Sequence, residues 1–112
     1  MLDIEHSGRS FETIEQQIAH AHGAGLVPIV KPRGGHRFAE HELLLDLGAQ
    51  GLIVPWVETG AEAAAIVRGT RDPPDGTRAW RRCAALAREQ GRSRSAGEPI
   101  SARPMVIPAA PP

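Results

Sequence analysis

The chain has 112 residues, which is enough for one domain with one hydrophobic core. Its 13 basic and 13 acidic side chains cancel to a formal net charge of zero, so the overall charge points to neither a nucleic acid nor a membrane surface as partner. A single cysteine excludes an internal disulfide framework, and no apolar run approaches the roughly 18 to 20 residues of a membrane span. The amino terminus also lacks the features of a signal peptide. We therefore expect a cytoplasmic protein.

Charge and proline are distributed unevenly along the chain. Residues 1–70 carry 5 Lys or Arg and 9 Asp or Glu, a balance of −4, whereas residues 71–112 carry 8 and 4, a balance of +4. Five of the ten prolines lie from Pro99 onward. Such a composition is typical of a disordered tail, and a shifted reading frame in GC-rich DNA would produce it as well. We expect a basic, Pro- and Arg-rich tail over residues 79–112, disordered from about Ser93 onward.

Residues 1–78 show alternating strand and helix signals. An apolar-led segment opens the chain, and Ser10 is expected to cap a helix that runs to about residue 22, because its apolar residues recur at helical spacing. Residues 26–30 form a continuous apolar run, as expected for a strand buried on both faces. A strand, a helix and a second strand are therefore predicted in this order.

The alternation then continues. Residues 38–47 predict a second amphipathic helix, and residues 52–57 a third buried strand. Thr59 and Glu62 have the spacing of a capping box and open a third, alanine-rich helix. Strand starts lie roughly 22 to 26 residues apart, which predicts a parallel sheet wrapped by helices. Half of a doubly wound sheet has the same period, but no Gly-x-Gly-x-x-Gly follows any strand.

Acidic and imidazole side chains gather where the first strand ends. Asp3, Glu5 and His6 lie within four consecutive residues. In parallel α/β sheets, ligands bind at the carboxyl ends of strands, so these residues form a candidate site. The alternative is an ordinary polar strand end at which His6 is a solvated bystander.

Four blocks of sequence follow one another between residues 2 and 78. They are Leu2-Asp-Ile-Glu-His-Ser7, Pro28-Ile-Val-Lys31, Leu44-Leu-Asp-Leu-Gly-Ala-Gln-Gly-Leu-Ile-Val-Pro-Trp-Val-Glu58 and Thr70-Arg-Asp-Pro-Pro-Asp-Gly-Thr-Arg78. In this order and spacing they resemble the HpcH/HpaI aldolase family. The resemblance implies a (β/α)8 TIM barrel and a class II aldolase that cleaves or forms 4-hydroxy-2-oxo acids, giving pyruvate plus an aldehyde. It also implies a divalent metal (Mg, Mn or Co), a small-molecule 2-oxo acid as substrate and a homo-oligomer.

The resemblance assigns roles to single residues. His6 matches the family's acid/base histidine, and Asp46 matches the aspartate proposed to pair with it. Retro-aldol cleavage removes a proton from the 4-hydroxyl of the substrate, and an imidazole oriented by a carboxylate suits that task. Asp3 and Glu5 are expected as hydrogen-bonding support. Without the resemblance, Asp46 reads as a surface residue near a helix end.

Lys31 stands where the family has an arginine that holds the carbonyl and carboxylate of the oxo acid. Lysine keeps the positive charge but lacks the planar fork that binds a carboxylate bidentately, so we expect weaker binding. Arg33, two residues further on, either reaches the substrate instead or is a solvated loop residue.

The family's metal ligands, a glutamate and an aspartate on later strands, are not matched in this chain. A complete barrel takes about 250 residues, so we expect a partial barrel of about three βα units over residues 1–78, inactive as a fragment. Two alternatives stay open: a non-catalytic truncated gene product, and a small interaction module that acts through the basic tail. Nucleic-acid binding by the tail is not expected, because Trp80 is its one aromatic residue.

Overall fold

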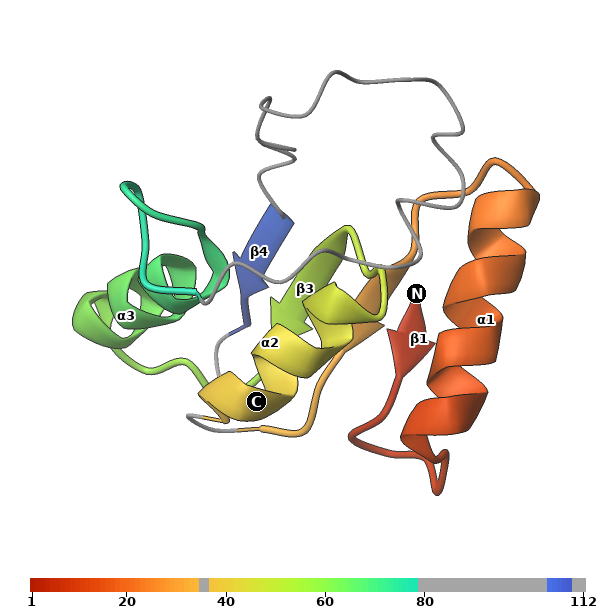
Figure 1. Cartoon of the computed structure of the whole chain (residues 1–112). Helices are drawn as coiled ribbons and strands as arrows, with labels where there is room; N and C mark the ends of the chain where they lie inside the picture. The colour runs from red at the N-terminus through yellow and green to blue at the C-terminus, as the bar shows by residue number, and fades with distance from the viewer. Residues whose placement is uncertain (35–36, 79–104, 110–112) are drawn as a thin grey trace, which may run out of the picture.

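The computed structural model of the chain describes residues 1–34, 37–78 and 105–109. Within them, strands and helices alternate along the sequence (Figure 1). The elements are β1 (Leu2–Asp3), α1 (Phe11–Gly23), β2 (Ile29–Lys31), α2 (Phe38–Asp46), β3 (Gly51–Val54), α3 (Gly60–Thr70) and β4 (Met105–Pro108). The three predicted βα units are therefore present, and β4 is an additional strand.

The sheet contains the described strands in the order β1-β2-β3-β4, and each neighbouring pair is parallel. In a doubly wound sheet the strand order reverses at a switch point, so it does not follow the sequence throughout. Here the order of the strands is the order of the sequence, with a helix after each of the first three. This is the arrangement of a segment of a (β/α)8 barrel, and Figure 1 shows the strands side by side and pointing the same way.

The helices begin and end where local signals place them. Ser10 accepts a hydrogen bond from the backbone N–H of Thr13 at 3.3 Å, and Thr59 and Glu62 form a reciprocal capping box at the start of α3. These bonds satisfy N–H groups that have no partner inside the first turn. After α2, Gly48 has a φ of 105°, a left-handed conformation that glycine adopts at little cost.

In the described residues, a hydrophobic core lies between the helices and the side of the sheet that faces them. Alternate strand residues point to this side, so Val30 of β2 and Leu52 and Val54 of β3 are each 0% exposed. Helices and loops complete the core with Ile4, Ile14, Ile18, Leu44, Leu45, Ala49, Val57 and Ile66.

The other residues of each strand point to the opposite side of the sheet. The register pairs Asp3 with Lys31, and Ile53 with Ile107. In a closed barrel this side is the interior. Asp3 and Lys31 are the last residues of their strands, so the inward-facing positions become polar at the carboxyl edge of the sheet.

Strand β4 corrects the expectation of disorder from Ser93 onward. Met105–Pro108 pairs with β3 along its whole length, and the N–H of Ala109 donates to the carbonyl of Val54 at 2.9 Å. The strand was missed because it has only four residues within a stretch rich in proline and arginine, so it shows no apolar period. The rest of the predicted tail lies outside the described residues.

Candidate active site

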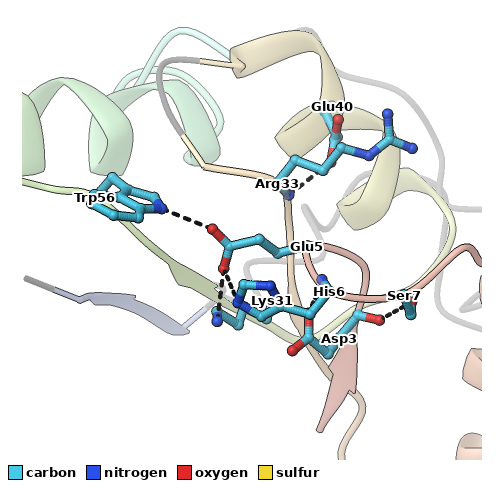
Figure 2. Close-up of polar contacts among 8 residues, drawn as sticks. All are labelled: Asp3, Glu5, His6, Ser7, Lys31, Arg33, Glu40 and Trp56. Atoms are coloured by element: carbon cyan, nitrogen blue, oxygen red, sulfur yellow. Dashed lines mark hydrogen bonds and ion pairs between the residues drawn. The ribbon is translucent and has the colours of Figure 1, made fainter. Parts of the chain in front are cut away.

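Polar side chains from three successive βα units meet at the carboxyl edge of the sheet. Glu5 and His6 follow β1, Lys31 ends β2, and Trp56 follows β3. Parallel strands end on the same edge, which is why residues so far apart in sequence lie together. Figure 2 shows these four side chains in contact, and we call them the Glu5 cluster.

Glu5 is the centre of the cluster. Its Oε2 lies 2.7 Å from Nζ of Lys31 and 3.2 Å from Nε2 of His6. Its Oε1 accepts a hydrogen bond from Nε1 of Trp56 at 2.8 Å. The side chains of Glu5 and Lys31 are 13% and 20% exposed, whereas that of His6 is 69% exposed. Both carboxylate oxygens are therefore engaged, and His6 is the member most accessible to a ligand from solvent.

Hydrogen bonding favours the charged forms of Glu5 and Lys31. The bonds from Lys31 and then from Trp56 hold the pKa of the Glu5 carboxyl below its usual value. The bond to Glu5 raises the pKa of the Lys31 ammonium above its usual value. At neutral pH the two residues are therefore an anion and a cation.

Asp3 supports the turn that follows β1. Its Oδ1 accepts a hydrogen bond from the backbone N–H of His6 at 3.1 Å, and its backbone carbonyl accepts one from the hydroxyl of Ser7. The bond from His6 is the largest cause that lowers the pKa of the Asp3 carboxyl. Asp3 therefore fixes the backbone that carries His6.

Trp56 has a backbone conformation that is rare outside glycine. Its φ is 62°, in the left-handed region, which costs on the order of 1–3 kcal/mol for such a residue. Trp56 was expected within the third strand and the long motif block, and its place in the site was not predicted. The predicted strand over residues 52–57 included Trp56, whereas β3 (Gly51–Val54) ends before it.

Arg33 does not join the cluster. Its backbone N–H donates to Oε1 of Glu40 at 3.0 Å, and its guanidinium lies over the ring of Phe11, 5.8 Å from the centroid. Figure 2 shows this side chain directed away from Glu5 and Lys31. Arg33 is therefore a loop residue whose guanidinium makes a cation–π contact with Phe11.

Asp46 lies at the opposite edge of the sheet from His6. It is the last residue of α2, and this helix starts near the carboxyl edge, after β2, and ends near the amino edge, before β3. There its Oδ1 accepts a hydrogen bond from Nη2 of Arg78 at 2.7 Å. The structure therefore does not bring His6 and Asp46 together at the carboxyl end of the sheet, as the resemblance led us to expect, because a βα unit returns the end of its helix to the amino edge.

The described residues do not fit a metal ion. They contain no group of three or more His, Cys, Asp or Glu side chains that could hold one. At the carboxyl edge, both oxygens of Glu5 already accept hydrogen bonds or pair with a cation, whereas a divalent cation needs several available oxygen ligands. We therefore assign no metal ligand in the described part of the chain.

The fold and the cluster define a class, that of (β/α)8-barrel proteins with a site at the carboxyl ends of the strands. The family model for HpcH/HpaI aldolase/citrate lyase matches residues 1–107. The chain belongs to this family. The match extends past Arg78, where the resemblance read from the sequence stopped, and includes most of β4.

Several similar proteins have aldolase names, and solved structures of HpcH/HpaI family proteins are also similar to this chain. A hydroxypyruvate/pyruvate aldolase of Roseovarius nubinhibens is 39% identical over 78 residues, or 70% of this chain and 30% of the relative. A 2-keto-3-deoxy-L-rhamnonate aldolase of Klebsiella pneumoniae is 32% identical over 92 residues, or 82% of this chain and 34% of the relative. The crystal structure of an HpcH/HpaI aldolase/citrate lyase family protein from Burkholderia cenocepacia superposes with a TM-score of 0.72 at 27% identity, covering 96% of this chain and 43% of that one. The chain thus spans about a third of the length of the curated relatives it matches.

Proposed function

We propose that the chain is part of a carbon–carbon lyase of the aldolase type, and that its carboxyl edge is the part of the site that binds a 2-oxo acid. The proposed reaction of the complete protein is the reversible cleavage of a 4-hydroxy-2-oxo acid to pyruvate and an aldehyde. Family membership supports lyase chemistry in general. The single observation that carries the assignment to this edge is the Glu5 cluster, which joins a cation, a carboxylate and an exposed imidazole.

Lys31 and His6 have separate roles in this proposal. The Lys31 ammonium attracts the carboxylate of the oxo acid. His6 accepts the proton of the 4-hydroxyl, the O–H electrons form the aldehyde carbonyl, and the C3–C4 bond breaks to leave the enolate of pyruvate. Protonation of the enolate at C3 completes the reaction. Asp3 and Glu5 position these two groups, and Arg33 stays a weaker candidate for substrate contact because its guanidinium lies on Phe11.

The remaining proposals follow from the family. A divalent cation (Mg, Mn or Co) belongs to the proposed reaction, but the described residues do not fit it and none of the steps above uses it. We propose a cytoplasmic homo-oligomer acting on a small molecule. In the described residues, no helix has both the length and the apolar character needed to cross a membrane. An interaction module in the basic tail would rest on residues that lie mostly outside the described ranges.

Calorimetric titration with pyruvate tests the proposed site. Lys31→Met should weaken binding at least about tenfold, because the ammonium is the group that meets the carboxylate. Arg68→Met is the matched control, since it removes one positive charge from an exposed position in the last turn of α3 and should leave the affinity unchanged. The double variant Glu5→Gln/Lys31→Met should be as weak as Lys31→Met, which separates loss of the ammonium from exposure of an unpaired carboxylate. Equal affinities for Lys31→Met and the unsubstituted chain would refute the assignment.

A further inference from the structure

The bond between Trp56 and Glu5 joins residues that are 51 positions apart in the sequence. The indole is half exposed, so burial in the core does not hold it in place. Its backbone is nevertheless in the left-handed region, with a φ of 62°. An outlier of this kind persists where the surroundings fix it, and such residues concentrate at functional sites. The described surroundings that fix the indole are Glu5 and Gly34.

Gly34 provides the space that the indole occupies. A Cβ built on Gly34 would lie 2.3 Å from Cδ1 and 3.0 Å from Nε1 of Trp56. Even the smallest side chain at this position would therefore push the indole away, and the atom that donates to Glu5 would move with it. Gly34, in the loop after β2, and Trp56, after β3, therefore fix the position of the indole together.

The orientation of the Glu5 carboxylate sets the geometry of the other groups. Its Oε2 contacts both Nζ of Lys31 and Nε2 of His6. The indole N–H binds the other oxygen and prevents the carboxylate from rotating. Without this bond, the carboxylate could turn and the ammonium and imidazole would lose their common partner.

We propose that Trp56 is a positioning residue of this site: its indole N–H fixes the Glu5 carboxylate so that one oxygen holds Lys31 and His6 together, and Gly34 gives the indole its place. This inference rests on the proposed function for its consequence, the binding of a 2-oxo acid. The hydrogen bond itself can be tested without any substrate.

The first experiment follows the indole N–H resonance of the full chain by NMR. The sequence has two tryptophans, so Trp80→Phe leaves Trp56 as the only indole. At pH 7, Glu5→Gln should shift this resonance, because a carboxylate acceptor becomes a weaker amide, and Gly34→Ala should shift it further towards that of a free indole. On acidification, the indole resonance should shift together with the carboxyl carbon resonance of Glu5. It should not instead follow the side-chain resonances of Asp3 or His6. An indole resonance that is the same in the Glu5→Gln protein would overturn the inference.

The second experiment is a double-mutant cycle on pyruvate affinity. Trp56→Phe keeps an aromatic ring and removes the donor, and it should weaken binding about threefold to tenfold, as expected for the loss of one hydrogen bond. In the Glu5→Gln background the same substitution should have little further effect, because the bond it removes is already weakened. An equal loss in both backgrounds would mean that Trp56 acts without Glu5 and would overturn the positioning role. If the unsubstituted chain does not bind pyruvate, the proposed function fails, and the NMR experiment alone decides whether Trp56 holds Glu5.

Discussion

Nζ of Lys31 lies 2.7 Å from Oε2 of Glu5, so the cation proposed to bind substrate is already paired with a carboxylate. An incoming oxo acid must share or displace this partner. The ion pair therefore keeps Glu5 negatively and Lys31 positively charged. The Glu5 carboxylate also competes with the substrate carboxylate for Lys31.

Lys31→Arg should tighten pyruvate binding by several-fold. A guanidinium can donate to Glu5 with one N–H and present others to the substrate carboxylate, whereas an ammonium is a single point of charge. Titration calorimetry on the two proteins at the same pH measures the difference. Weaker binding by the arginine variant would show that the space beside Glu5 fits only the lysine.

Lys31 should not form an imine with pyruvate. It is the only lysine in the sequence, and its hydrogen bond to Glu5 raises the pKa of the ammonium, so the nucleophilic free amine is scarce at neutral pH. Treatment with pyruvate and borohydride, followed by mass spectrometry of the peptide that contains Lys31, should show no adduct. In the Glu5→Gln protein, the carboxylate no longer raises the pKa of the Lys31 ammonium. The yield of trapped adduct there should therefore be equal to or higher than that of the unsubstituted chain. A stable adduct on Lys31 of the unsubstituted chain would contradict the electrostatic role.

The stabilisation from Glu5 should depend on pH in a defined direction. The pKa of Glu5 is lowered by folding, so its contribution is present above the unfolded value of about 4.3 and is lost as pH falls through the folded value. The pKa of Lys31 is raised, so its contribution is present below the unfolded value of about 10.4 and is lost as pH rises through the folded value. Urea unfolding should show a lower free energy of unfolding for Glu5→Gln near pH 7 and a smaller difference at both extremes. A difference that is constant with pH would contradict the ion pair.

Asp46→Asn should lower the free energy of unfolding by about 1 kcal/mol, through loss of its bond to Arg78, and leave pyruvate affinity unchanged. The two side chains are 21% and 12% exposed, so the bond is only partly screened by solvent. Arg78→Met and the double variant complete a cycle that isolates the pair. If Asp46→Asn weakens pyruvate binding as strongly as His6→Ala, the aspartate acts in the site after all.

Local features could be predicted from the sequence because they depend on neighbouring residues. The cap at Ser10 and the capping box of Thr59 and Glu62 lie within four residues of their partners, and the apolar runs that became β2 and β3 are continuous. The regular βα period predicted a parallel sheet wrapped by helices, and the resemblance to the family predicted that this sheet is a segment of a barrel.

Contacts between distant residues could not be predicted in the same way. Nothing near Trp56 in the sequence indicates that its indole reaches Glu5 and lies against Gly34, because both contacts depend on the fold. The error at Asp46 was avoidable, since the last residue of a helix in a βα unit returns to the amino edge of the sheet. Family motifs identified the residues but not the edge at which each one lies.

An aldolase assay of the 112-residue chain tests the central claim most directly, namely that its described residues carry the oxo-acid edge of an HpcH/HpaI site without the metal donors. The purified chain is mixed with pyruvate, a short aldehyde and Mg2+, Mn2+ or Co2+, and the aldol product is followed over time. A divalent cation would stabilise the negative charge of the enolate by several kcal/mol, and the described residues contain no group of ligands that could hold one, so the chain should give no product above the protein-free blank. Metal-stimulated turnover that His6→Ala abolishes would contradict the claim and would mean that metal ligands exist outside the residues assigned here.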